Sequence, residues 1–336
     1  MIDGSVEIQR VSFEGLRARL TEVFRQAGVI RHNAGILADN CARCERDGVH
    51  SHGIFRIPGY LGSLESGWVD GRAQPRVEQA GDGYLRVDAA NGFAQPALDA
   101  ARSQIEDSLA RSGHCIVAIR DSHHFSALWP DLEPFAEAGY VGFTTVTGVA
   151  HVVPPGGHTP VFGTNPIAFA TPVAEAPPLI FDQATSTMAH GDLQIAAREG
   201  KTVPMGTGVD RSGNASDSPE SILEGGLSPF GGHKGGSIAL MVEILASALT
   251  GGQFSSEVDL SGHPGAQTPR TGQFLLLIDP ARGDNAAFAR RVAGLLEAVR
   301  SAGQSRLPGE RRLRHRRDAE RHGIPITRQD WEALAK

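Results

Sequence analysis

Apolar residues recur at helical spacing through the first seventy positions of the chain. Ser12 can cap a first helix that ends at Gly28, a second helical pattern runs from about 33 to 48, and a third runs from 60 to 67. The inward stripe of the first helix is Leu16, Leu20, Val23 and Phe24. The chain is therefore expected to open with a helical unit, and the cysteines at 41 and 44 are expected to pack in its core.

Beyond residue 80 the pattern changes to short apolar runs, typical of strands, that alternate with longer helical stretches. Strands are predicted at 84–88, 115–119 and 274–278, and helices at 94–111 and 286–301. Because these pieces share one β–α pattern although they lie far apart in the sequence, they are expected to form one small sheet with two helices. The residues between them would then be an insertion.

The insertion, from about 120 to 271, is rich in glycine, proline, threonine and short runs of valine, isoleucine and phenylalanine. Frequent turns with few helices favour a mixed, largely antiparallel sheet over a doubly wound one. One helix stands out at 238–249, because it is apolar on nearly every side and is therefore expected to be buried. The predicted fold class is α/β, of the α+β type. Its boundaries are expected at 1–78 and 304–336 for a helical part, 79–119 and 272–303 for a small α/β part, and 120–271 for the insertion.

Charge and cysteine content narrow the class of protein. The chain has 32 lysine and arginine residues against 38 aspartate and glutamate residues, so its net charge of -6 provides no general basic field for nucleic acid. Three cysteines are too few for a disulfide framework and fit a reducing compartment. The N-terminus lacks the apolar core of a signal peptide, and the longest apolar stretch is too short to span a bilayer. A cytoplasmic protein is expected.

The stretch 47–60 concentrates two histidines, a serine and an arginine between glycines. Gly48 and Gly53 permit a tight backbone, and a helical turn from Gly53 would put His52 and Arg56 on one face. Arginine can hold a carboxylate through two parallel hydrogen bonds while histidine exchanges a proton beside it. The alternative is a helix–loop–helix in which the histidines only cap or hydrogen-bond.

A glycine-rich loop at 231–236 precedes the apolar helix and contains Lys234. Free backbone N–H groups, a helix N-terminus and an ammonium group together suit a phosphate. The loop matches neither the P-loop nor the Rossmann fingerprint, so a glycine-rich turn beside a crowded helix is the alternative.

Six arginines lie between Arg306 and Arg317, around a Pro-Gly turn at 308–309. The usual fate of such a run is a solvated helix start. The functional alternative is a clamp for a phosphomonoester, such as the 2′-phosphate that distinguishes NADP from NAD. A nucleic-acid-binding role is disfavoured because no aromatic residues are interleaved with the arginines.

Two further stretches combine hydroxyl and imidazole groups, and the second of them, 181–192, also contains acidic groups. Residues 122–130 follow the strand at 115–119, where ligand contacts are common. Residues 181–192 include Asp192, which could orient a catalytic histidine, although turn-forming aspartates and helix caps are the alternative. The 13 histidines show no metal-ligand spacing, so no metal site is expected.

Taken together, these motifs resemble the malate/L-lactate dehydrogenase-like family of NAD(P)-dependent oxidoreductases, which lacks a Rossmann fold. The family markers stand at 47–53, 163–169, 181–186 and 230–235, spread over most of the chain. The stretches that look like the Δ1-piperideine-2-carboxylate/Δ1-pyrroline-2-carboxylate reductase branch are 66–71, 122–130, 188–192, 231–235, 261–265 and 306–312. The resemblance implies a discontinuous helical and small α/β part with an inserted, mostly antiparallel NADP-binding domain.

The resemblance also implies roles for individual residues. His52 would be the proton donor in a charge-relay set with Ser51 and Asp192, and Arg56 would hold the substrate carboxylate with Thr164 and His190. The residues implied in cofactor binding are His124, Phe125, Ser126, Ala127, Leu128, Asp182, Gln183, Ala184, His233, Lys234, Arg306, Leu307, Pro308, Gly309, Glu310, Arg311 and Arg312. NADPH is the implied cofactor, with NAD as the alternative. The family forms homodimers with the active site near the subunit boundary.

The first hypothesis for the activity is NADPH-dependent reduction of cyclic imino acids. Δ1-Piperideine-2-carboxylate would give L-pipecolate and Δ1-pyrroline-2-carboxylate would give L-proline, reactions associated with lysine degradation and proline metabolism. A malate or lactate type of 2-oxo acid dehydrogenase using NAD(P) is the second hypothesis. A module that binds nucleic acid or another anionic partner through 306–317 is the third. Under the first hypothesis no membrane and no nucleic-acid partner is expected.

Overall fold

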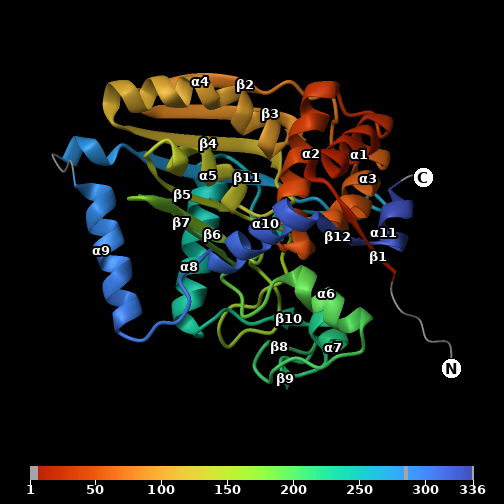
Figure 1. Ribbon diagram of the computed structural model, residues 1–336. Coiled ribbons are helices and arrows are strands. Elements are labelled where there is room, and N and C mark those ends of the chain that lie inside the picture. Colours follow the sequence, from red (N-terminus) through yellow and green to blue (C-terminus); the bar gives the residue numbers. More distant parts are fainter. Residues whose placement is uncertain (1–6, 284–286, 335–336) are drawn as a thin grey trace.

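The computed structural model describes residues 7–283 and 287–334. Figure 1 shows a helical part that contains the first and the last described elements, a central sheet with covering helices, and a smaller lobe. Within the described ranges, no helix combines the length and the apolar character that crossing a membrane requires.

The helical part begins as the sequence predicts. The Ser12 hydroxyl accepts a backbone hydrogen bond from the first turn of α1 at 3.1 Å, and the inward stripe of that helix is buried apart from the partly buried Val23. Cys41 and Cys44 are buried free thiols, which confirms that they pack in the interior. The first and last strands pair antiparallel, so both ends of the chain belong to this part. Its elements are β1 (Ile8–Val11), α1 (Phe13–Gln26), α2 (Arg31–Arg46), η1 (His50–His52), η2 (Ile54–Arg56), α3 (Ile57–Glu65), α10 (Glu310–His322), β12 (Ile324–Thr327) and α11 (Arg328–Ala333).

A seven-stranded sheet in the order β2-β3-β4-β11-β5-β6-β7 forms the centre of the molecule. β3 and β4 are parallel and joined by α4, and every other neighbouring pair is antiparallel. Helix α4 packs on β3 and β4, and α5 packs on β5, β6 and β7. The elements are β2 (Arg76–Gly81), β3 (Tyr84–Phe93), α4 (Ala94–Ser112), β4 (His114–His123), α5 (Trp129–Glu137), β5 (Val141–Val146), β6 (Ile167–Val173), β7 (Ala176–Gln183), β11 (Arg270–Ile278), η5 (Pro280–Gly283) and α9 (Phe288–Ser301).

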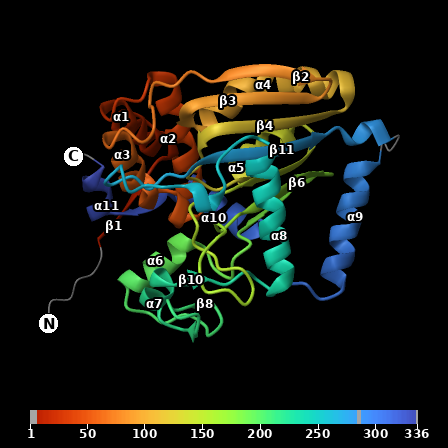
Figure 2. The same ribbon diagram turned by 180° about the vertical axis from the view of Figure 1, so that it is seen from behind.

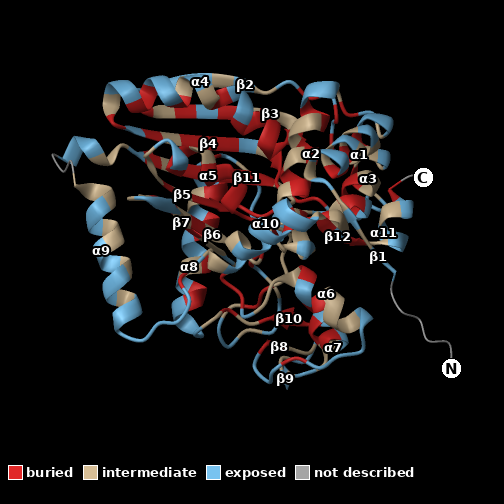
Figure 3. Ribbon diagram, in the orientation of Figure 1, coloured by how far each residue is buried: buried red, intermediate tan, exposed pale blue. Residues whose placement is uncertain are grey.

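The largest apolar cluster lies between this sheet and its helices, and Trp129 and Phe135 of α5 are its bulkiest fully buried side chains. Figure 3 shows buried residues concentrated along β4, β11 and α5. The α/β class with a mostly antiparallel insertion is confirmed.

The expectation of a separate small sheet is wrong. The strands at 84–88, 115–119 and 274–278 do lie together, but the free edge of β11 pairs with β5, so the sheet continues into the insertion. An unpaired edge would leave the backbone groups of a buried strand without partners. The predicted helix at 286–301, observed as α9 over its described residues, lies against β6 instead of the small sheet. The domain boundaries themselves stay a prediction.

The lobe has an apolar cluster of its own that includes Val152, Leu193 and Leu227. Its three short strands are ordered β10-β8-β9. Its elements are α6 (His190–Arg198), β8 (Gly208–Val209), β9 (Ala215–Ser216), α7 (Pro219–Glu224) and β10 (Gly226–Leu227), and α8 (His233–Glu243), η3 (Ile244–Ala248) and η4 (Ser255–Glu257) follow it.

The prediction that the apolar helix at 238–249 is buried is wrong. This stretch forms the end of α8 and the π-helical turn η3, which run along the near surface in Figure 2. Leu240 and Ile244 are each 52% exposed, although Ala239 and Val242 are fully buried. Periodicity cannot distinguish a helix enclosed by its own chain from one that presents a second apolar face at the surface.

Candidate active site

Close backbone packing shapes the loop that carries the predicted catalytic residues. Two short 3-10 turns, η1 and η2, are separated by Gly53. A Cβ on Gly53 would collide with the Glu45 carboxylate, which accepts the Ile54 N–H at 2.9 Å. The backbone therefore passes close to Glu45, and His52 and Arg56 on successive turns line the same pocket, as their spacing predicts.

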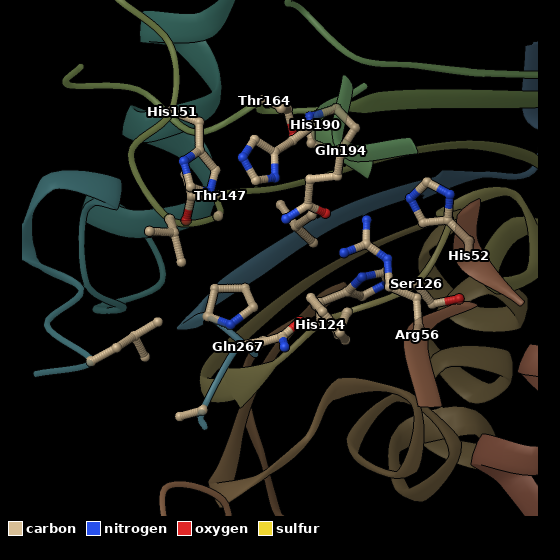
Figure 4. Close-up of a pocket in the computed structure, with 18 residues that line it drawn as sticks. His52, Arg56, His124, Ser126, Thr147, His151, Thr164, His190, Gln194 and Gln267 are labelled. Atoms are coloured by element: carbon tan, nitrogen blue, oxygen red, sulfur yellow. The ribbon is translucent and has the colours of Figure 1, made fainter. Parts of the chain in front are cut away.

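This pocket has a volume of about 300 Å³ and is bounded by the helical part, the sheet and the lobe. Figure 4 shows imidazole, amide and hydroxyl groups around it, with Arg56 reaching in from one side. Its polar lining consists of His52, Arg56, His124, Ser126, Thr147, His151, Thr164, His190, Gln194 and Gln267.

Arg56 is held in place without a carboxylate partner. Its Nε donates to the Ser51 carbonyl at 2.8 Å, and its guanidinium lies 4.4 Å from the centre of the Phe125 ring. No ion pair joins it to an acidic residue within the described ranges. Burial lowers the pKa of Arg56. A desolvated positive charge beside a cavity is suited to an anionic ligand.

His52 lies next to this charge. Its Nδ1 is 3.2 Å from the Ser51 Oγ, so these two predicted partners are in contact. Burial, followed by the charges of Arg56 and His124, lowers the pKa of His52 to about 3, so the ring is neutral at neutral pH. Asp192 is exposed at the start of α6, and no hydrogen bond links it to His52 among the described contacts. The relay through Asp192 stays a prediction.

His124 enters the pocket with a buried acid behind it. Its Nε2 is 2.9 Å from Asp131 Oδ2, which also accepts the Gln273 amide at 2.8 Å. Its Nδ1 is buried without a hydrogen-bond partner. This imidazole therefore has an unused polar atom beside the pocket.

A second hollow, of about 560 Å³, adjoins the first. Both are lined by His52, Ser126, Thr164 and Pro166, so the two cavities meet at these residues. The second hollow brings together predicted cofactor residues that are far apart in the sequence, namely Ser126, Ala127, Leu128, Asp182, Gln183, Ala184, Arg311 and Arg312. It also contains Ser51 and Asp192.

Some predicted cofactor residues have structural contacts of their own. Asp182 accepts the backbone N–H groups of Leu128 and Trp129 at 2.7 and 3.0 Å, which secures the segment after β4. Arg312 donates to the Ile180 carbonyl at 2.8 Å. Arg311 is exposed, and among the described contacts it has neither an ion pair nor a hydrogen bond.

The turn before α10 lines a neighbouring hollow with Arg311, and its residues there are Arg306, Leu307, Pro308 and Gly309. Glu310 accepts the Leu307 N–H at 2.8 Å and pairs with Arg300, so it shapes this turn. Exposed guanidinium groups beside a cleft have the chemistry needed for an anionic phosphate. The second hollow extends from Arg311 to His52.

The glycine loop at 231–236 is not brought into these hollows. His233 and Lys234 are exposed at the start of α8 and line none of the three cavities. The preceding residue, Phe230, donates its N–H to the Thr185 carbonyl, and Thr185 donates to the Thr164 carbonyl, each at 2.9 Å. The loop is thus connected to the pocket residue Thr164 through the backbone hydrogen bonds of Phe230 and Thr185. Its phosphate-binding role stays a prediction.

Four polar residues of the pocket were not found from the sequence: Thr147, His151, Gln194 and Gln267. Gln194 lies one helical turn after His190 in α6, and that spacing is the available signal. His151 and Gln267 belong to loops without a regular pattern. Among residues 7–283 and 287–334, no group of three or more potential ligands is placed to hold a metal ion.

Comparison with known proteins adds a family. The model of the malate/L-lactate dehydrogenase family matches residues 11–335. A Δ1-pyrroline-2-carboxylate/Δ1-piperideine-2-carboxylate reductase of Pseudomonas putida is 53% identical over 328 residues, which cover 97% of this chain and 96% of that protein. The crystal structure of Δ1-piperideine-2-carboxylate reductase from Pseudomonas syringae pv. tomato, 55% identical, superposes with a TM-score of 0.95 over 97% of this chain and 98% of that one. Malate dehydrogenase of Entamoeba histolytica, 23% identical, shares the fold with a TM-score of 0.90 over 98% and 97% of the two chains.

Proposed function

The chain belongs to the malate/L-lactate dehydrogenase family, and on that premise we propose that it is an NADPH-dependent reductase of cyclic imino acids. The substrates are Δ1-piperideine-2-carboxylate and Δ1-pyrroline-2-carboxylate, and the products are L-pipecolate and L-proline. The two Pseudomonas reductases, similar over nearly their whole length, support this substrate class over a 2-oxo acid.

The guanidinium of Arg56, which forms no ion pair with any described residue, is the observation that carries the proposal. Both imino acids have a carboxylate on the carbon of the C=N bond. If Arg56 holds that carboxylate, the adjacent imine carbon lies in the same small cavity, beside the junction with the second hollow. Thr164 and His190, which line the same cavity, complete the binding site.

His52 would exchange or hydrogen-bond the proton on the substrate nitrogen. Its Nδ1 faces Ser51, so Nε2 is available to the substrate nitrogen. Because burial and Arg56 keep the ring neutral, Nε2 can accept a hydrogen bond from the N–H of an imine that binds already protonated. An imine that binds neutral requires a protonated His52, and the substrate carboxylate favours this form by offsetting the charge of Arg56. In either case one proton ends on nitrogen as the π electrons of C=N move there.

The second hollow suits a nicotinamide dinucleotide. The exposed Arg311 and Arg306 would face the 2′-phosphate of NADP, and 124–128 with 182–184 would line the rest of the molecule. When bound, the nicotinamide supplies the hydride that the imine carbon receives. Asp182 orders the binding segment through two backbone N–H groups, which fixes the wall against which the cofactor would lie.

A steady-state panel tests the proposal. Each imine, pyruvate and oxaloacetate is assayed with NADPH and with NADH. We expect turnover of both imines, higher kcat/KM with NADPH, and weak or absent turnover of the oxo acids. Turnover of the oxo acids alone would instead identify a malate or lactate type of dehydrogenase.

We further propose that the protein acts as a homodimer in the cytoplasm. The apolar face of α8 and η3, with Leu240, Met241 and Ile244 exposed, is suited to a second copy of the chain. Three free, buried cysteines fit a reducing compartment. Light scattering of the purified protein should give about twice the 35.6 kDa chain mass. Ile244→Glu should shift it to the monomer.

A further inference from the structure

Two imidazole rings lie face to face in the pocket wall. The ring centroids of His151 and His190 are 3.7 Å apart and their planes differ by 4°. Both line the pocket, and Figure 4 shows them on the side away from His52 and Arg56. One face of His190 is therefore covered, which leaves its other face and its ring edge for a ligand.

Both histidines are held by the lobe. The His151 N–H donates to the Phe162 carbonyl and the His151 carbonyl accepts the Leu227 N–H, each at 2.8 Å. Val152, which follows His151, and Leu193, on the first turn after His190, are fully buried in one apolar cluster of the lobe. The backbone of each histidine is thus fixed relative to the other.

Burial, together with nearby positive charge, lowers the pKa of both rings and keeps the pair neutral. The groups that face the stack are Arg56 from η2, His52 from η1 and His124 from the segment after β4, while Asp192 on α6 is exposed. Burial and Arg56 lower the pKa of His151 to about 4, and burial, His151 and Arg56 lower that of His190 to about 3. Two neutral rings can stack closely, whereas two charged rings would repel each other.

We propose that His151 is a positioning residue for the substrate: by covering one face of His190, it holds that ring at the angle at which its edge meets the carboxylate bound by Arg56. The inference rests on the proposed function, in which Arg56 binds the carboxylate of a planar cyclic imino acid. His151 itself touches His190 and acts on the substrate only through it.

Substitutions at His151 separate stacking from other roles. His151→Ala removes the covering ring, so KM for both imines should rise about 3- to 10-fold, the strength of one aromatic pair, while kcat and the KM for NADPH change less than about twofold. His151→Phe keeps a flat ring and should restore the KM. The control is His158→Ala, because His158 is an exposed histidine of the same loop outside the pocket lining.

Two measurements do not depend on turnover. Calorimetry with pyrrole-2-carboxylate, a planar carboxylate that is not reduced, should show the same rise in Kd in His151→Ala and its recovery in His151→Phe. Proton NMR of labelled histidine should show an upfield ring-current shift of His190 in the wild type and in His151→Phe, and loss of that shift in His151→Ala.

Unchanged KM and Kd in His151→Ala, or equal increases in the alanine and phenylalanine variants, would overturn the positioning role. These outcomes are distinct from failure of the proposed function. Suppose that the Kd values for pyrrole-2-carboxylate follow the predicted order in the wild type and the variants, but the wild type reduces neither imine. The positioning role of His151 would then stand, and the proposed reductase activity would not.

Discussion

Two neighbouring regions of this molecule treat the same positive group in opposite ways. In the ion-pair cluster at the start of the loop that carries His52, Arg316 donates to Asp47 at 2.5 Å and to Glu133 at 2.8 Å, and Asp47 is fully buried. In the neighbouring pocket, the partners of Arg56 are a carbonyl and an aromatic ring, and none of the described carboxylates forms an ion pair with it. The charges of the first arrangement are paired within the chain, whereas we propose that the second binds a ligand carboxylate.

The pKa directions express the same contrast. Burial works against the charged form of both arginines, but hydrogen bonds and charges from Asp47 and Glu133 outweigh it and raise the pKa of Arg316. At Arg56 burial prevails and lowers the pKa. A buried arginine that is paired with carboxylates inside the protein stabilises the fold, and a buried arginine without such a partner indicates a ligand-binding site.

The sharpest test removes the neutral histidine on the ligand side. His52→Ala should lower kcat about 10²- to 10⁴-fold, because the proton on the substrate nitrogen loses its acceptor or donor. The KM for NADPH and the urea midpoint should change little. Turnover equal to that of the wild type would remove His52 from the mechanism.

Replacing each of the two arginines by methionine tests the contrast directly. Arg316→Met removes the arginine that Asp47 and Glu133 share. Asp47 keeps Arg46 and Glu133 keeps Arg43 as a partner, so the loss should cost about 1.5–3 kcal/mol of unfolding free energy. Arg56→Met should leave that free energy unchanged or higher and lower kcat/KM for the imines about 10²- to 10³-fold. Urea unfolding and initial rates measure both. A stability loss at Arg56 as large as at Arg316 would contradict the distinction.

The same contrast distinguishes two neighbouring residues of the arginine run, Arg311 and Arg312. Arg311 has no partner among the described contacts, so Arg311→Ala should raise the KM for NADPH about tenfold and leave that for NADH nearly unchanged. Arg312 holds the Ile180 carbonyl and lies over the Trp129 ring, so Arg312→Ala should lower the melting temperature and affect both cofactors alike. Equal effects of Arg311→Ala on the two cofactors would place the 2′-phosphate elsewhere.

The last effect is spread over several residues and comes from pH. The pKa values of His52, His123, His151 and His190 are lowered, first by burial, to between about 3 and about 4. Below about 6.5 the unfolded chain takes up protons that the folded chain does not, so stability should fall towards pH 4 by up to about 1.4 kcal/mol per pH unit for each histidine. His50, whose pKa Glu45 raises, acts in the opposite sense. Urea unfolding at pH 7, 6 and 5 measures the slope, and His151→Phe should reduce it by one proton.

Local sequence patterns were enough to predict many of the helices and strands and the pairing of His52 with Arg56 in one pocket. A cap at Ser12 and the apolar stripe behind it predict α1, and glycines around His52 and Arg56 predict a shared pocket. The continuation of the sheet from β11 to β5 could not be predicted, because it depends on pairing between distant segments. His151 could not be predicted either, since it reaches the pocket from an irregular loop that is placed by contacts with Phe162 and Leu227. The exposed face of α8 has the same composition as a buried one.

The central strand β11 has a consequence for how ligands reach the cleft. It is hydrogen-bonded to β4 on one side and to β5 on the other, and the segments that carry His124 and His151 follow those two strands. The sheet therefore provides no hinge between these two strands, whereas His151 itself is hydrogen-bonded to Phe162 and Leu227 of the lobe. We therefore expect ligands to enter by movement of the lobe relative to the sheet, where α6 lies against the Arg56 loop at Gly191. The amide protons of α6 should then exchange with deuterium sooner than those of β4 and β11.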